Sequence, residues 1–327
     1  MKKIHYIVLS VFILAILGFL GVYYSCKDVK KVHKVRVAEV THSIFYAPFY
    51  VSIHNGYFKD EGLDIEVILT SGADKVASAV LSEDVNIGLS GLEATIYVFN
   101  NKAKDYLVNF SGLTKRDGQF LVGDCKYKDT FKLDDLKGKT VLAGRSGGMP
   151  SMVFMYGLHK NEVSLDDVNV DTSVDFANLS GAYIGGQGEF VNLFEPTALG
   201  IEKEGYGCVL SSIGLMSGEV PYTVFHTKKS YLNNNRNVIN KFRKAIDRGL
   251  EFVKNNNSET IANVIKSEFT GTSFDDIVKV VDRYKGADSW QTDTTIREGA
   301  YNNLLDLMEY NKVISERPEF DTLVYNE

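Results

Sequence analysis

Short apolar stretches alternate with stretches of helical periodicity between residue 34 and about residue 150. The apolar stretches have the length of strands and are rich in Val, Ile and Leu, whereas Ala73–Leu81 places its apolar residues on one helical face. Pro48 and Pro150 suit the first turn of a helix, which does not use the N–H that proline lacks. The strand candidates are 34–40, 63–69, 85–89, 106–112, 119–122 and 139–143. Such alternation predicts an α/β fold with a parallel sheet covered on both faces.

The last third of the chain is predicted to be helical. Ser258 and Ser273 precede two helical segments, and a serine hydroxyl can accept a hydrogen bond from an unpaired N–H at a helix start. The apolar stripe of the longest helix is Ile239, Phe242, Ile246, Leu250 and Val253. Stripes of this kind are typical of core faces and do not indicate a cofactor site.

The N-terminus is predicted to be an export signal. Two lysines precede an almost wholly apolar run, Ile4–Val22, which is typical of a secretion signal. The pair Ser25-Cys26 at its end resembles a bacterial lipoprotein signal, in which cleavage before the cysteine frees it to receive a lipid. Tyr23 stands where such signals usually have Leu. The resemblance implies a signal peptide over residues 1–25 and lipidation at Cys26.

The same run leaves two alternatives. Its length is close to the roughly 20 residues that span a bilayer, so an uncleaved membrane anchor is the main alternative. A buried N-terminal helix is the third interpretation. Both leading interpretations place the rest of the chain outside the cytoplasm, on the outer face of the cell membrane. Residues 26–33 are polar and lysine-rich, and are predicted to be a tether.

Composition and motifs exclude several functions. The formal net charge is −6, which disfavours nucleic acid as a partner, and 44% hydrophobic residues exclude wholesale disorder. Cys26, Cys125 and Cys208 are too few and too scattered for a disulfide scaffold and show no CxxC spacing. The sequence contains no HExxH, G-x-S-x-G or GxxxxGK[ST] motif, and its six histidines are dispersed. We therefore expect no metal and no cofactor.

Seven sequence blocks, taken in order, resemble a known family. They are 42–50 (HSIFYAPFY), 56–64 (GYFKDEGLD), 72–74 (GAD), 85–88 (VNIG), 133–139 (LDDLKGK), 194–197 (FEPT) and 217–222 (SGEVPY). They resemble the extracytoplasmic substrate-binding proteins of ABC importers, in the group that handles thiamine pyrimidine precursors, alkanesulfonates, taurine and nitrate. The resemblance covers about residues 34–311, and the FEPT block looks most like the thiamine-pyrimidine branch.

The resemblance implies a two-lobed periplasmic-binding-protein fold of type II, with two crossover hinge strands and a ligand held between the lobes. Lobe 1 would comprise residues 34–117 plus 225–312, lobe 2 residues 118–224, and a C-terminal tail residues 313–327. The crossings would lie near 115–120 and 220–226, where the sequence suits extended segments. An ABC permease with its ATPase is the implied partner.

Four loops at predicted strand ends are the candidate ligand site, because open α/β sheets bind ligands at the carboxyl ends of their strands. Aromatic rings could stack on a flat ligand, the glycine-rich loop could offer N–H groups, and carboxylates could accept hydrogen bonds. Each loop also has a structural interpretation: core packing for the first, local turns for the next two, and a surface carboxylate for Glu195. The candidates are Tyr46, Phe49, Ser90, Gly91, Glu93, Ser146, Gly147, Gly148, Phe194 and Glu195.

A receptor without chemistry of its own is the favoured function. The alternatives are a pyrimidine-synthesising enzyme of the same fold, which has a cysteine-rich cluster that this sequence lacks, and a structural surface protein. Three carboxylates on the candidate loops, Glu93, Glu189 and Glu195, would repel an anion in a closed cleft. We therefore expect a small, planar, nitrogen-rich ligand rather than a sulfonate or nitrate.

Overall fold

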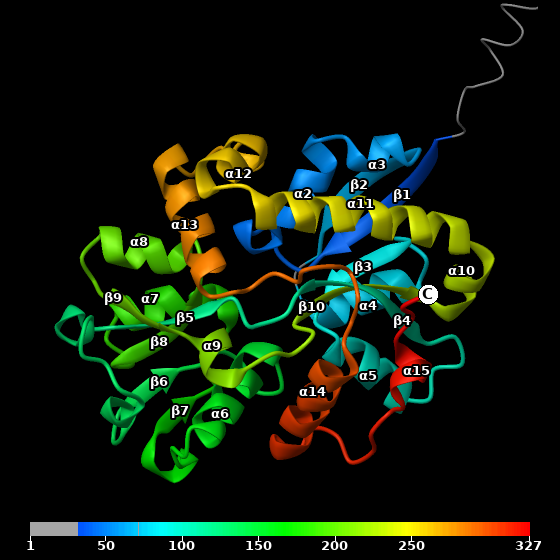
Figure 1. The fold of residues 1–327 in the computed structure, drawn as a ribbon. Helices are drawn as coiled ribbons and strands as arrows, with labels where there is room; N and C mark the ends of the chain where they lie inside the picture. Colours follow the sequence, from blue (N-terminus) through cyan, green and yellow to red (C-terminus); the bar gives the residue numbers. More distant parts are fainter. Residues whose placement is uncertain (1–31, 71) are drawn as a thin grey trace, which may run out of the picture. The chain divides into compact units, whose positions relative to one another are not determined.

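The structure is a computed structural model and describes residues 32–70 and 72–327. Residues 34–327 form one compact unit around two five-stranded sheets (Figure 1). The first sheet, in the order β2-β1-β3-β10-β4, contains β1 (His33–Glu39), β2 (Leu63–Leu69), β3 (Ile87–Ser90), β4 (Leu107–Thr114) and β10 (Thr223–Lys228). The second, in the order β7-β6-β8-β5-β9, contains β5 (Gln119–Gly123), β6 (Thr140–Leu142), β7 (Asn169–Asp171), β8 (Phe190–Phe194) and β9 (Cys208–Ser212). We call the parts built on these sheets lobe 1 and lobe 2.

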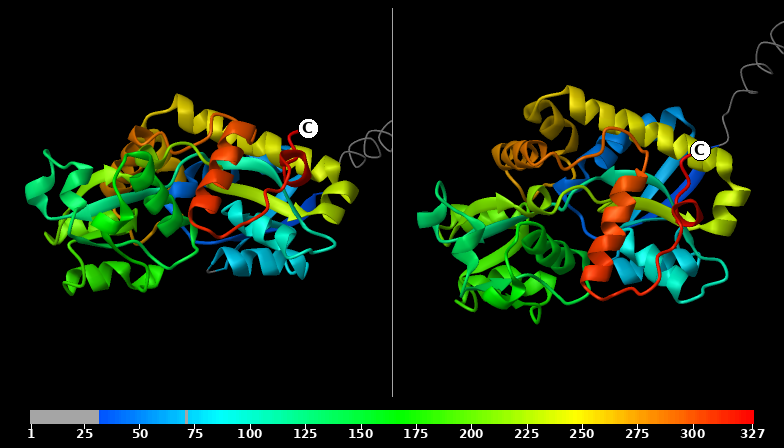
Figure 2. Two further views of the ribbon diagram at one scale, coloured as in Figure 1. Left: turned by 90° about the horizontal axis from the view of Figure 1, so that it is seen from below. Right: turned by 60° about the horizontal axis from the view of Figure 1, so that its bottom comes forward.

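Helices cover both faces of the first sheet, with α2, α3 and α11 on one side and α4 and α5 on the other (Figure 1). The α-helices that begin before residue 200 are α2 (Ala47–His54), α3 (Tyr57–Asp60), α4 (Ala73–Leu81), α5 (Glu93–Asn100), α6 (Met149–Lys160), α7 (Leu179–Ile184) and α8 (Thr197–Lys203). The later ones are α9 (Ile213–Ser217), α10 (Lys229–Asn234), α11 (Arg236–Asn255), α12 (Ser258–Ile265), α13 (Phe274–Gly286), α14 (Glu298–Tyr310) and α15 (Phe320–Leu323). In both views of Figure 2, α14 lies between the lobes, where it contacts α6.

The predicted α/β class is confirmed, but both sheets are mixed rather than wholly parallel. β1 pairs in parallel with β3, and β6 pairs in parallel with β7 and β8. β10 is antiparallel to β3 and β4, and β5 is antiparallel to β8 and β9. The antiparallel strands β5 and β10 each follow a crossing between the sheets, so the chain enters the new sheet from the opposite direction.

The two crossings run side by side. Residues 115–118 lead from β4 to β5, and residues 218–222 lead back to β10. The N–H of Val220 donates to the carbonyl of Lys115 at 3.0 Å. The segment that follows α13 also contacts the first crossing, because the N–H of Lys115 donates to the carbonyl of Ser289 at 2.8 Å. The chain thus changes sheets between residues 114 and 119 and between 212 and 223; the finer lobe boundaries stay a prediction.

Local signals in the sequence account for several helix starts. Pro48 and Pro150 lie in the first turns of α2 and α6, as expected. The Ser273 hydroxyl accepts from the N–H of Asp276 at 3.2 Å and caps α13. The prediction for Ser258 was wrong by one residue, because the Asn257 side chain caps α12 instead.

One apolar core continues through both lobes and the crossings, and smaller clusters pack under α4 in lobe 1 and under α7 and α8 in lobe 2. The C-terminal tail joins the edge of the first sheet. Leu323 is buried, and the N–H of Tyr325 donates to the carbonyl of Asn109 at 2.8 Å. Within residues 32–70 and 72–327, no helix is long and apolar enough to cross a membrane. The predicted signal segment and Cys26 lie outside the described residues.

Cys125 and Cys208 form a disulfide, although their wide spacing in the sequence did not indicate a pair. The pairing of β5 with β9 places Gly123 opposite Cys208 and so brings the two cysteines together. They are 83 residues apart in the sequence. Sequence spacing alone could not show this, because it contains no information about which strands become neighbours.

The disulfide should stabilise lobe 2. Because it closes a long loop in the unfolded chain, we expect the double variant Cys125→Ser/Cys208→Ser to lose about 2–4 kcal/mol of unfolding free energy. Urea unfolding followed by circular dichroism measures this loss, and wild type treated with reductant should unfold at the same urea concentration as the variant. Equal midpoints for the variant and the oxidised wild type would contradict the prediction.

Candidate ligand-binding site

The candidate loops of the two lobes meet at the crossings. From lobe 1, the Tyr97 hydroxyl on α5 donates to the carbonyl of Gly147 at 3.3 Å. The Ser43 hydroxyl donates to the carbonyl of Glu195 at 3.4 Å. Loops after β1, β6 and β8 thus contribute to one region, together with α5, which follows β3, as the carboxyl-end rule for open sheets predicts.

Aromatic rings from both lobes fill this region. The 3-10 helix η1 (Ile44–Tyr46) begins at Ser43, whose hydroxyl accepts from the N–H of Phe45 at 3.2 Å. The Phe45 ring centroid lies 5.7 Å from that of Phe194 and 5.9 Å from that of Tyr222. Tyr46 is buried beside these rings, and burial raises the pKa of its hydroxyl. Tyr46 and Phe194 thus both lie next to Phe45, with ring centroids 5.8 Å and 5.7 Å from its own. Phe45 and Tyr222 were not among the candidates chosen from the sequence.

Phe49 lies elsewhere. It is fully buried in lobe 1, where its ring packs against Tyr50, Phe58 and Phe225. These partners belong to α2, α3 and β10 of lobe 1, so the packing of Phe49 fits the structural interpretation. We do not include Phe49 in the site.

Glu93 is a buried carboxylate of the candidate site. It is the first residue of α5 and is only 5% exposed. Its Oε2 has no hydrogen-bond partner among the described residues, and burial raises the pKa of the carboxyl to about 7. Gly91 makes room for it, because a Cβ at residue 91 would lie 1.9 Å from Oε2. Ser90 is buried, and its hydroxyl forms a hydrogen bond with Nε2 of His226 at 2.9 Å. Its side chain is therefore engaged by the neighbouring strand β10.

The glycine-rich loop, residues 144–148, connects β6 to α6 and is partly exposed to solvent. Ser146 is exposed, and Gly147 and Gly148 are half-buried. Gly148 precedes the first residue of α6. Arg145 is exposed and pairs with Asp74 at 3.3 Å across the lobes. The Gly147 carbonyl of this loop accepts the hydrogen bond from Tyr97, whereas the Arg145 guanidinium binds the exposed carboxylate of Asp74.

Glu195 is buried, not a surface carboxylate, and both of its oxygens are engaged. Oε1 accepts from Arg283 of α13, which also pairs with Glu202. Oε2 accepts from the N–H of Leu199 at 2.9 Å in the first turn of α8. Burial raises the pKa of Glu195, and Arg283 opposes this effect. The Glu195 carboxylate therefore connects the first turn of α8 to Arg283 of α13.

Several buried polar atoms near the crossings have no partner among the described residues. Asp117 Oδ2, Gln119 Oε1, and both amide atoms of Asn192 are in this group. All three residues are 0% exposed. The sequence analysis missed them, although Gln119 and Asn192 are polar residues within otherwise apolar strands, and that signal could have found them.

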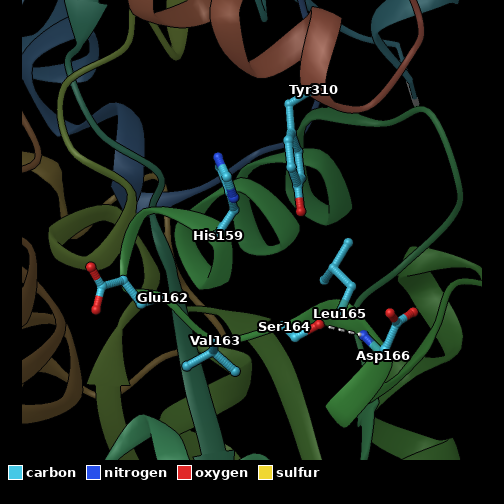
Figure 3. A pocket seen from close by; sticks show the side chains of 7 residues that line it. All are labelled: His159, Glu162, Val163, Ser164, Leu165, Asp166 and Tyr310. Carbon is cyan, nitrogen blue, oxygen red and sulfur yellow. Dashed lines mark hydrogen bonds between the residues drawn. The ribbon is translucent and has the colours of Figure 1, made fainter.

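Two cavities lie away from these loops. One, of about 420 Å³, is lined by His159, Tyr310 and residues 162–166 (Figure 3). It lies at the end of α6 opposite the glycine-rich loop; a helix of 12 residues is about 18 Å long. The other, of about 270 Å³, lies between α4 and α10 and is lined by Val80, Lys228 and Asn235 among others. Among the described residues, no group of His, Cys, Asp and Glu is arranged to hold a metal ion.

Comparison with known proteins agrees with the fold and the motifs. The chain is 42% identical over 304 residues to "Putative binding protein YtlA" of Bacillus subtilis (strain 168), a match that covers 93% of the chain and 91% of that protein.

Two solved structures are similar to this one. The alkanesulfonate-binding protein SsuA from Xanthomonas axonopodis pv. citri, bound to MOPS, has a TM-score of 0.70 at 13% identity, over 91% of this chain and 99% of that one. The periplasmic nitrate-binding protein NrtA from Synechocystis PCC 6803 has a TM-score of 0.62 at 16% identity, over 76% and 70%. At these identities the two structures show the periplasmic-binding-protein fold alone. Residues 44–260 match the family described as NMT1/THI5 like, and the chain therefore belongs to the NMT1/THI5-like family.

Proposed function

We propose that the chain is the solute receptor of an ABC importer, which captures a small, planar, nitrogen-rich molecule between its lobes and delivers it to a membrane permease with its ATPase. The family, the fold and the relative named as a binding protein support the solute-binding role. The chain is accordingly a binding protein and not an enzyme. The ligand class is inferred from the site.

The Glu93 carboxylate is the observation that carries the ligand class. It is buried at the meeting of the lobes, and its Oε2 has no partner among the described residues. A carboxylate in this position suits a ligand with N–H donors, because a charge-assisted hydrogen bond contributes roughly 1.5–3 kcal/mol. Rings such as Tyr46 and Phe194 can cover the flat face of a heterocycle. An aminopyrimidine, such as a thiamine pyrimidine precursor, has both features.

A sulfonate or nitrate is the second candidate, because two proteins of similar structure are named for binding these anions. The start of α6 offers N–H groups that could bind an anion. The adjacent Arg145, however, is exposed and pairs with Asp74. A desolvated anion would also lie near Glu93, and like charges repel more strongly at low dielectric. A pyrimidine-synthesising enzyme is less favoured, because Cys125 and Cys208 are joined to each other.

Thermal-shift measurements and calorimetry test the proposed ligand class. Ligands would include aminopyrimidines, taurine, an alkanesulfonate and nitrate. Binding to the folded state raises the melting temperature by mass action. We expect a shift with at least one aminopyrimidine and none with the anions. Tight binding of taurine or nitrate, without binding of any pyrimidine, would overturn the proposed ligand.

The binding of a neutral aminopyrimidine should depend on pH. With a pKa of about 7, the Glu93 carboxyl is mostly protonated at pH 6.5 and mostly ionised at pH 8. The ionised form is the better acceptor, so affinity should increase about fourfold over this range. Calorimetry at pH 6.5, 7.2 and 8 measures the trend, which should be smaller in Glu93→Gln. Affinity that is constant or that falls with pH would contradict the assignment.

We also propose that Cys26 is the lipid-bearing N-terminus of the mature protein, which anchors the receptor to the outer face of the membrane. The support is the apolar run that ends in Ser25-Cys26. Mass spectrometry of the protein purified from its membrane should find residue 26 as the first residue, with a lipid attached. A mature protein that still begins at Met1 would contradict lipidation and leave the membrane-anchor interpretation.

A further inference from the structure

Several polar residues at the crossings between the lobes are fully buried without complete hydrogen bonding. Three of them, Asp117, Gln119 and Asn192, lie in or next to the strand pair β5–β8, and each is 0% exposed. Asp117 Oδ2, Gln119 Oε1, and Oδ1 and Nδ2 of Asn192 have no partner among the described residues. More than about 90% of buried polar groups in proteins are hydrogen-bonded, and each unpaired group costs about 1–3 kcal/mol. Three such residues in one region therefore point to a function.

The backbone and neighbouring groups hold these side chains in place. Asp117 Oδ1 accepts from the N–H of Gln119 at 2.6 Å, which leaves Oδ2 free to bind another group. The amide nitrogen of Gln119 donates to the carbonyl of Asn192 at 3.3 Å, which leaves Oε1 as the free acceptor. In the β5–β8 pair, Gln119 lies opposite Phe194. Because side chains alternate along a strand, Asn192 lies on the same face as Phe194.

Tyr222 connects this group to Glu93. The Tyr222 hydroxyl faces the Asp117 carboxyl, and burial raises the pKa of that carboxyl to about 8. Burial also raises the pKa of Tyr222, and its interactions with Asp117 and Glu93 add to this effect. The two basic residues next to Asp117 face away from it, because Lys115 and Arg116 pair with Asp288 and Glu219. Among the described residues, Asp117 therefore has no ion-pair partner.

We propose that Asp117, Gln119 and Asn192 form a second polar subsite, which binds an additional N–H or O–H group of the ligand that Glu93 and the aromatic rings hold. This inference rests on the proposed function and deepens it. The subsite offers three acceptor oxygens and one donor nitrogen, so it selects a neutral or cationic ligand that is rich in donors. A heterocycle with two donor groups, such as a diaminopyrimidine, has this chemistry, and an anion does not.

Calorimetry with matched probes tests the subsite. 4-Aminopyrimidine has one amino group, and the 2,4-, 4,5- and 4,6-diaminopyrimidines have two. We expect wild type to bind at least one diamino isomer about tenfold or more tightly than 4-aminopyrimidine. In Asp117→Asn an amide can place an N–H group at the position of Oδ2, so this preference should fall below threefold. Glu93→Gln should weaken both kinds of probe together.

The melting temperatures of ligand-free variants distinguish a ligand-binding role of Asp117 and Asn192 from a structural one. If Asp117 and Asn192 serve the ligand, the ligand-free variants should melt at or above the wild-type temperature, because Asp117→Asn removes a buried carboxyl that has no ion-pair partner among the described residues and Asn192→Leu removes an unpaired amide. A lower melting temperature with unchanged probe preference would overturn the proposal. So would equal binding of all the pyrimidines by wild type, which would leave the proposed function standing. Failure of every pyrimidine to bind would overturn the proposed ligand class and this subsite together.

Discussion

Replacing Glu93 by glutamine is expected to weaken the binding of an aminopyrimidine by about 10- to 100-fold. The substitution keeps the shape of the side chain but removes the charge, and a charge-assisted hydrogen bond contributes roughly 1.5–3 kcal/mol. Glu93 is buried with one oxygen unpartnered among the described residues, so surrounding solvent does little to weaken its interaction with a ligand. Calorimetry of the purified variant measures the change.

Glu189→Gln is the matched control. Glu189 is another carboxylate of the candidate loops, directly before β8, but its side chain is half exposed and lies near Lys139, 3.6 Å away. Its loss should leave ligand affinity within about twofold of wild type, because exposed ion pairs contribute little. A Glu93→Gln variant that binds the aminopyrimidine as tightly as wild type would remove the main support for the proposed ligand.

Replacing Arg283 by methionine should destabilise the protein strongly. Arg283 of α13 pairs with Glu195 and Glu202 of lobe 2, and the three side chains are 17%, 0% and 11% exposed. Removing the cation leaves two buried carboxylates without it, and breaking a buried ion pair costs about 3–5 kcal/mol. For a chain of this size we expect the melting temperature to fall by roughly 10 °C.

Lys203→Met tests the same interface at an exposed pair. Lys203 of α8 pairs with Asp276 of α13 at 2.7 Å, with 56% of the lysine side chain exposed. Its loss should cost less than about 1 kcal/mol. Equal melting temperatures for Arg283→Met and Lys203→Met would contradict a special role for Arg283. Glu195→Gln should also lower the melting temperature, because it removes the charge of one partner of Arg283.

Much of the fold could be predicted from local sequence patterns. The alternation of apolar and helical stretches gave the α/β class, and Pro48, Pro150 and Ser273 marked helix starts that the structure contains. These features depend on the geometry of a few consecutive residues, which is why composition and periodicity indicate them. The segment that joins β4 to β5 was likewise recognised as a crossing.

The candidate loops chosen from the sequence meet where the two lobes come together, but their role in ligand binding stays a prediction. Glu93, Tyr46 and Phe194 lie where the lobes meet, as strand-end loops should. Phe49 has the same aromatic character but packs inside lobe 1, and the Glu195 carboxylate binds Arg283, 88 residues further along the chain. Neither role can be read from residue type, because it depends on which distant element covers the side chain.

Local patterns in the sequence by themselves determined the segments that form β1 to β6 and most helices of the last third, and the resemblance to a known family implied that the chain crosses between two lobes. Only the tertiary structure decided that Cys125 meets Cys208, that α13 is fastened to α8, and that Asp117, Gln119 and Asn192 are buried together without complete hydrogen bonding. The physical reason is that local periodicity fixes backbone conformation, whereas partners far apart in the sequence are fixed by strand order and by the burial of apolar surface.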